Sequence, residues 1–281
     1  MSTPETARET SAGPALPASG GPAAAGPAPR TSAAAALTRA GARAYLRDRT
    51  TVFFTFAFPL VFLVVFGLIF QGQQVTAGGA AYIDRIAPGV LSWGVGNAAL
   101  FGVAFTLMHW RRDDVLRLIR RTPTPLAAVL ASRVAVSLAV GLVQAALFTG
   151  VALLPPFGLR PAGSWPLMIP VLVLGITAFM ALGVVVGSLA DTPEAVAAIA
   201  NCVMVPMAFL SGSFYPSELM PGWLQGLSRA LPLRYFNDGV IDTLSGRGGA
   251  ADLALACGGL AGFAALFTLI ALRLFRWSNR S

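Results

Sequence analysis

Lysine is absent from this chain, and all 20 of its basic residues are arginine. A P-loop places a lysine against the terminal phosphates of a nucleotide, so the chain holds no P-loop of its own. Lysine Schiff-base and general-base chemistry are excluded for the same reason. Any use of ATP by this protein would therefore depend on a nucleotide site in another chain.

Histidine and cysteine are scarce: the chain has one histidine, His109, and two cysteines, Cys202 and Cys257. These residues are too few and too scattered for a zinc site of ordinary spacing, so we expect no metal centre. Both cysteines fall inside apolar stretches, where we expect them to act as small buried hydrophobic residues. His109 stands beside Trp110 at the end of an apolar stretch, which favours an interfacial structural role over catalysis.

Charged residues are also few, at 11% of the chain against 56% hydrophobic residues. A soluble domain carries about 25% charged residues, so this chain has too few to cover a water-facing surface. It is predicted to be an integral membrane protein. The net charge of +8 could suggest a nucleic-acid partner, but no basic soluble domain exists to bind one. The arginines lie in short segments beside apolar stretches, the pattern that sets membrane topology.

Six apolar stretches are long enough to span a bilayer, which takes roughly 20 residues of helix. The fifth stretch contains Pro206 and Asn201 but keeps a high apolar content. In the fourth, Gly183 and Gly187 form a small-xxx-small pair, which predicts close packing against another helix. The fold class is therefore an all-α integral membrane protein with six transmembrane helices, at about residues 52–70, 86–108, 131–154, 167–190, 195–212 and 253–275.

The N-terminal part of the chain divides into a tail and a basic segment. Residues 1–36 are rich in Pro, Ala, Gly, Ser and Thr, without hydrophobic periodicity or the apolar core of a signal peptide. They are predicted to form a disordered tail that is not cleaved, ahead of a membrane domain at residues 37–281. Arg39, Arg43 and Arg47 then share one helical stripe. This spacing predicts an interfacial helix before the first span, or alternatively a simple basic topology signal.

The arginines are divided unequally between the two sides of the six spans. Five flank one side, and Arg8 and Arg30 lie too far from a span to count. By the positive-inside rule, both termini are predicted to be cytoplasmic in the cell membrane. The richer side holds thirteen arginines: Arg39, Arg43, Arg47, Arg49, Arg111, Arg112, Arg117, Arg120, Arg121, Arg133, Arg273, Arg276 and Arg280.

A charged insert at residues 109–125 separates the second and third apolar stretches. On a helical wheel, Val115, Leu116, Leu118 and Ile119 take one side, and charged residues from Asp113 to Arg121 take the other. This pattern predicts a helix at the cytoplasmic membrane surface with a charged face free for a partner. The alternative is that the charged face is only solvated.

The connection between the fifth and sixth spans, residues 213–252, is long and hydrophobic in its first half. Its prolines break it into short pieces, and its large apolar residues recur at helical spacing. One or two short re-entrant helices that dip into the outer leaflet are therefore predicted before the sixth span. The residues that carry this prediction are Pro216, Pro221, Trp223, Leu227, Leu231 and Pro232.

Two segments of the chain resemble those of a known family. Residues 111–123 resemble the segment between the second and third spans of ABC-2 type transporter permeases. Residues 209–216, Phe-Leu-Ser-Gly-Ser-Phe-Tyr-Pro, resemble the family's late Leu-Ser-Gly stretch, and the Pro-x-Trp-Leu and Pro-Leu groups follow at 221–224 and 232–233. With the six-span layout, the resemblance covers about residues 37–281 and is nearest to actinobacterial daunorubicin-efflux permeases. Members often carry a glycine at the position of Asp114.

The resemblance implies a coupling helix that docks on an ATP-binding subunit, a second permease copy, and re-entrant extracellular helices. It implies no cofactor in this chain, because ATP and magnesium would be bound by the partner. The residues expected to form the docking surface are Arg112, Asp113, Asp114, Leu116, Arg117, Ile119, Arg120 and Arg121.

The expected function is that of a membrane subunit without enzymatic activity, in an ATP-binding-cassette exporter. Its apolar spans favour an amphipathic drug, antibiotic or lipid-like substrate, although polysaccharide and haem exporters share this composition. Asn97 and Asn201 fall within spans, where they could hydrogen-bond helices together or line the path. The alternatives are an ATP-independent channel or scaffold and a membrane-embedded enzyme. A serine protease would need Ser211 beside His109, but these are predicted at opposite membrane faces.

Overall fold

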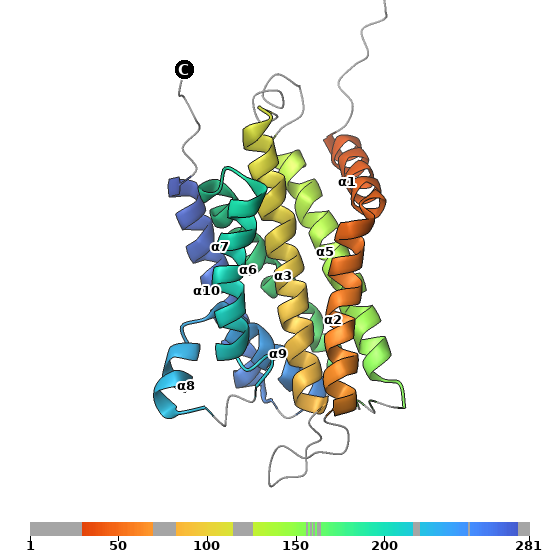
Figure 1. Cartoon of the computed structure of the whole chain (residues 1–281), viewed down its shortest axis with the longest axis vertical. Coiled ribbons are helices and arrows are strands. Elements are labelled where there is room, and N and C mark those ends of the chain that lie inside the picture. The colour runs from red at the N-terminus through yellow and green to blue at the C-terminus, as the bar shows by residue number, and fades with distance from the viewer. Residues whose placement is uncertain are drawn as a thin grey trace, which may run out of the picture.

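The computed structural model describes residues 30–69, 83–114 and 126–274, except for 156, 158, 160, 162–163, 216–219 and 247. In these ranges the regular structure is helical (Figure 1). Most of the predicted tail lies outside them, although the first helix starts at Arg30, ahead of the expected boundary at Leu37. The helices are α1 (Arg30–Arg47), α2 (Arg49–Ile69), α3 (Ile83–Arg112), α5 (Leu126–Ala152), η1 (Trp165–Leu167), α6 (Met168–Leu189), α7 (Pro193–Leu210), α8 (Gly222–Ser228), α9 (Pro232–Ser245) and α10 (Ala250–Leu274).

Six of these helices are long and apolar enough to cross a membrane: α2, α3, α5, α6, α7 and α10. They correspond one to one with the six predicted spans, so this prediction is confirmed. Their ends differ from the sequence estimate by a few residues. The clearest case is α3, which continues to Arg112, past the expected end at residue 108.

The central pair of the bundle is α3 and α6, which run side by side (Figure 1). A Cβ atom added to Gly183 would lie 2.5 Å from the carbonyl oxygen of Leu100, and one added to Gly187 would lie 2.6 Å from that of Ala104. Because neither glycine has a side chain, the two helix backbones touch directly. The close packing predicted from the small-xxx-small pair is confirmed.

The outer helices bury only a narrow face within the chain. Phe53 and Phe54 on α2 and Leu272 on α10 are among many large apolar side chains that are exposed. A soluble monomer rarely exposes so much apolar surface, whereas lipid solvates it. The same geometry corrects the expectation for one cysteine: Cys202 is exposed on α7, and Cys257 is partly buried. An apolar sequence context indicates burial in the bilayer, which is not the same as burial in the protein.

The helix α2 continues through Pro59 with help from α5. Proline has no N–H to give to the carbonyl four residues earlier, which here belongs to Thr55. The Nε2 atom of Gln144, a buried side chain on α5, donates to that oxygen at 3.0 Å. A Cβ on Gly94 of α3 would lie 2.9 Å from the Pro59 ring. The proline site therefore joins three helices.

The junction of α1 and α2 is held by local hydrogen bonds. Asp48 precedes α2 and accepts hydrogen bonds from the backbone N–H of Thr51 at 3.1 Å and from its hydroxyl at 2.5 Å. These bonds favour the ionised carboxylate, so the pKa of Asp48 is lowered. The hydroxyl of Tyr45 donates to Thr55 at 2.7 Å, and burial raises the pKa of this phenol. The hydrogen bonds of Asp48 and Tyr45 together hold α1 at an angle to α2 (Figure 1).

The predicted segment before the sixth span forms two short helices, α8 and α9. Pro221 precedes α8, and Pro232 is the first residue of α9, a position where its missing N–H costs nothing. Trp223 on α8 is 73% exposed, whereas α9 packs among α3, α6 and α10. Pro216 lies outside the described residues. The sequence left open one or two short helices here, and the structure has two, because α8 ends at Ser228 and α9 begins at Pro232.

Candidate functional site

The described part of the predicted docking surface lies at the end of α3, where Arg112 ends the helix and Asp113 and Asp114 form a turn. All three residues are exposed, so they are available to a partner. The other five predicted docking residues lie outside the described residues: Leu116, Arg117, Ile119, Arg120 and Arg121.

Asp114 has a backbone φ of 52°, the left-handed conformation. Among the described residues other than glycine, it is the only one with a positive φ. Side chains with a Cβ resist this conformation, whereas glycine adopts it freely and aspartate tolerates it better than most. The conformation favours glycine at this position and makes aspartate one of the better-tolerated alternatives.

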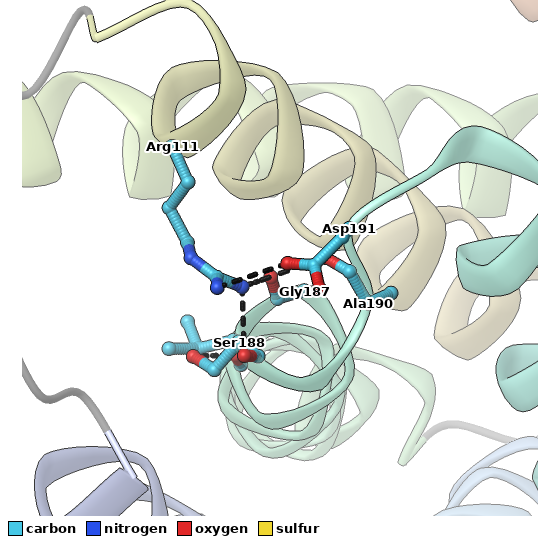
Figure 2. Close-up of polar contacts among 6 residues, drawn as sticks. Arg111, Gly187, Ser188, Ala190 and Asp191 are labelled. Carbon is cyan, nitrogen blue, oxygen red and sulfur yellow. Dashed lines mark hydrogen bonds and ion pairs between the residues drawn. The ribbon is translucent and has the colours of Figure 1, made fainter. Parts of the chain in front are cut away.

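Arg111, one residue before the predicted surface, joins α3 to the turn between α6 and α7 (Figure 2). Its Nη1 atom donates to the carbonyl oxygens of Gly187 at 3.0 Å, Ser188 at 2.7 Å and Ala190 at 3.4 Å. Its Nη2 atom forms an ion pair with the carboxylate of Asp191 at 3.2 Å. Sequence reasoning used Arg111 only as a topology signal and missed these contacts.

The contacts of Arg111 meet a specific need at the end of α6. The last four carbonyl groups of a helix have no partner within it, and here they carry the negative end of the helix dipole. Arg111 supplies donors and positive charge to Gly187 and Ser188, both in the last turn of α6. Its planar, permanently charged guanidinium holds five donors in a fixed fork that reaches several acceptors at once, whereas a lysine has three donors on one compact ammonium group.

The start of α7 follows this turn directly, with Glu194 in the first turn of the helix. The turn itself is ordered by Thr192, whose hydroxyl oxygen accepts a hydrogen bond from the backbone N–H of Ala195 at 3.2 Å. Arg111 thus engages the end of α6 and Asp191 in the turn that follows, immediately before the predicted docking segment.

Arginines gather at this end of the bundle. Arg133 on α5 lies over the ring of Trp110 on α3, 5.0 Å from its centroid, in a cation–π contact. By contrast, Arg229 and Arg234 belong to the region of α8 and α9 at the other end of α6. The described arginines on the elements at the Arg111 end are Arg30, Arg39, Arg43, Arg47, Arg49, Arg111, Arg112, Arg133 and Arg273.

The asparagines that sequence analysis singled out lie away from this end. Asn97 on α3 is partly buried and Asn201 on α7 is exposed, and no hydrogen bond joins either to another described residue. Their role at the path or in packing stays a prediction. Two buried amides were missed: Gln144, described above, and Asn237, whose Nδ2 donates to the Ser211 carbonyl at 3.0 Å. Neither bond could be inferred from sequence, since its partner lies on a distant segment.

His109 and Ser211 lie too far apart to act together. A Cβ on Gly89 of α3 would lie 2.5 Å from the carbonyl oxygen of Ser213, so the turn after α7 sits beside this part of α3. His109 follows Gly89 by 20 residues on the same helix, and a helix rises about 1.5 Å per residue. The two side chains are therefore about 30 Å apart, which rules out a nucleophile–base pair.

Comparison with known proteins places these features in a family. The sequence model of the ABC-2 type transporter family matches residues 33–244. The chain is 30% identical over 234 residues to daunorubicin resistance ABC transporter permease protein DrrB1 of Streptomyces coeruleorubidus, covering 79% of this chain and 78% of that protein. It is 27% identical over 180 residues to inner membrane transport permease YadH of Escherichia coli, covering 64% of this chain and 69% of the relative.

A third relative is linearmycin resistance permease protein LnrN of Bacillus subtilis, 24% identical over 180 residues that cover 63% of this chain and 46% of that protein. The family match extends from α1 to the end of α9 and so includes five of the six spanning helices and the Arg111 turn. This chain belongs to the ABC-2 type transporter family, as a multi-pass permease of the cell membrane.

Proposed function

We propose that this chain is the membrane subunit of an exporter driven by ATP hydrolysis in a separate ATP-binding subunit. The main support is the fixed base of the charged segment: Arg111 holds the end of α3 on the α6–α7 turn through three backbone carbonyl oxygens and the carboxylate of Asp191. A segment that transmits force from a soluble partner needs such a rigid base. The absence of lysine leaves this chain without a P-loop, so ATP and magnesium would be bound by the partner.

The proposed docking surface begins at the exposed residues Arg112, Asp113 and Asp114 and continues through Leu116, Arg117, Ile119, Arg120 and Arg121. Apolar residues would seat the segment against the partner or the bundle. Charged residues would fix its register, since complementary charge governs orientation and specificity more than affinity.

The proposed orientation places the Arg111 end of the bundle in the cytoplasm, together with both termini. Support comes from the gathering of described arginines at that end, which the positive-inside rule assigns to the cytoplasm. The domain at 37–281 would then follow a cytoplasmic tail, with α1 as an interfacial helix: its Arg39, Arg43 and Arg47 are exposed while its other face packs on α5.

The proposed mechanism uses two copies of this chain and two ATP-binding subunits. Closure of the ATP-binding subunits would move the docking segments, which would tilt α3 and α6 and open the path alternately to each side. Pro221, Trp223 and Pro232, with Pro216, would belong to a re-entrant outer lid, and Asn97 and Asn201 would line the path or pack helices. An amphipathic substrate is favoured by the apolar spans and by the drug-resistance names of two relatives.

The proposal is tested by changing the docking segment and measuring binding of the ATP-binding subunit. We expect Leu116→Asp, or Arg117→Glu combined with Arg120→Glu, to abolish co-purification of that subunit and transport while the permease still inserts in the membrane. Reversal of Arg39 and Arg43 on α1 provides a control with the same charge change at the same end. Full binding and transport by the docking variants would refute the proposal.

A further inference from the structure

We infer that Arg111 is a positioning residue, which makes α3, α6 and the α6–α7 turn move as one body when the docking segment is displaced. This inference rests on the proposed function and extends it. It concerns a residue outside the docking surface, since the Arg111 side chain points toward α6 and is engaged by four acceptors there (Figure 2).

The geometry favours transmission to α6 over any other helix. Below Arg111, Gly187 and Gly183 bring the α6 backbone against the α3 carbonyls of Ala104 and Leu100. This backbone contact covers about one turn of each helix, and Arg111 adds a further contact at the end of α6. Packed backbones resist sliding because nothing flexible lies between them. Arg111 resists rotation of α3 against α6 because its guanidinium is held by four acceptors at once.

Arg111 also extends the rigid body beyond α6. The ion pair with Asp191 connects α3 to the turn that leads into α7. At its other end, α7 leads to the buried turn at Ser211, which the Asn237 amide on α9 contacts. A displacement at the end of α3 would thus reach the outer segment through α6 and α7.

A purely static cap would give a different result from a positioning residue. Loss of a static cap lowers the stability of the fold, but the molecules that remain folded still respond to ATP. Loss of a positioning residue leaves folded, partner-bound molecules in which the outer end no longer responds. The two roles are distinguished by measuring how the outer end of the intact complex responds to ATP, and not by measuring how much complex is obtained.

The test uses this chain in complex with its ATP-binding subunit in lipid nanodiscs, with Cys202 and Cys257 replaced by serine. A single cysteine in place of the exposed Tyr215, just beyond α7, reports on the outer end through its rate of labelling by a maleimide dye. We compare complexes without nucleotide and after trapping with ATP and vanadate. With Arg111 intact, the labelling rate should change on trapping.

In Arg111→Gln we expect the ATP-binding subunit to remain bound and to hydrolyse ATP, while the change in labelling rate on trapping is lost. Arg111→Lys keeps the charge but not the fork of donors, and it should lose most of the change in labelling rate on trapping. This variant replaces Arg111→Gln in the test if the glutamine variant does not fold. Asp191→Asn keeps the contacts between Arg111 and the carbonyl oxygens, so it should lose only part of the change in labelling rate. Arg273→Gln is the matched control, since Arg273 is an exposed arginine in the last turn of α10 at the same end.

If both Arg111 variants show the full change in labelling rate on trapping, the inference is overturned and the proposed function stays intact. The same holds if the labelling rate does not change on trapping in the protein that retains Arg111. Failure of the ATP-binding subunit to bind the chain that retains Arg111 would instead refute the proposed function itself.

Discussion

Asp114 occupies a backbone conformation that few side chains accept, with φ of 52°. We predict that Asp114→Gly is neutral or stabilising, because glycine adopts this conformation freely. Asp114→Val should have a free energy of unfolding about 1–2 kcal/mol below that of the glycine variant, because a β-branched side chain resists the left-handed region. Thermal unfolding of the purified protein in detergent measures both. Equal stability of the valine and glycine variants would show that the turn does not hold this conformation.

Gln144 and Pro59 form a pair that a double-mutant cycle can test. Gln144→Leu should destabilise the protein by about 1–3 kcal/mol, because the partly buried Thr55 carbonyl loses its donor. In the Pro59→Ala background the same change should cost much less, since the alanine N–H can bond to that carbonyl. Thermal unfolding of the four proteins gives the coupling energy. Additive effects would mean that the amide does not replace the missing helix bond.

At the residue scale, sequence reasoning found polar positions by type but not by partner. Asn97 and Asn201 attracted attention because asparagine is costly in a span, yet the structure buries Gln144 and Asn237 more deeply. Arg111 was counted among the topology arginines, and nothing in the sequence distinguishes it from Arg112. Its acceptors come from residues 76 to 80 positions later in the chain, a separation that only the folded bundle closes.

At the scale of elements, the contact between α3 and α6 can be tested with one type of substitution at two glycines. Gly187→Ala should destabilise the protein by about 1–3 kcal/mol, as overpacking does, because the new Cβ would lie 2.6 Å from the Ala104 carbonyl oxygen. Gly102→Ala on α3, where a Cβ meets nothing within 4 Å, should be neutral or stabilising by up to about 1 kcal/mol, since alanine favours helix. Unfolding temperatures in detergent distinguish the two. Similar behaviour of both variants would argue against direct backbone contact.

The spanning helices were predicted better than the packing between them, and the reason is physical. A spanning helix is encoded in the apolar content of some 20 consecutive residues, so all six appear in the sequence. Packing is encoded only where small residues force close approach, as at Gly183 and Gly187. The sequence left open whether one or two short helices precede the sixth span, because Leu231 continues the apolar spacing of α8, while in the structure its backbone is already extended ahead of Pro232.

At the scale of the whole molecule, the two ends of the bundle differ in chemistry. The Arg111 end gathers arginines and the α6–α7 turn, and the opposite end is covered by α8 and α9 with exposed Trp223. The arginine count in the sequence anticipated this asymmetry. The single-chain structure adds that α2, α7 and α10 leave broad apolar faces open, which lipid and a second copy would cover.

The most direct test of the central claim is the composition and activity of the complex that this chain forms in its own membrane. The chain would be purified from host membranes through an affinity tag, and the complex analysed by native mass spectrometry and assayed for ATP hydrolysis. The account predicts equal numbers of this chain and of an ATP-binding subunit, two of each, with ATPase activity that co-elutes. A chain that purifies without an ATP-binding subunit and without ATPase activity would contradict it.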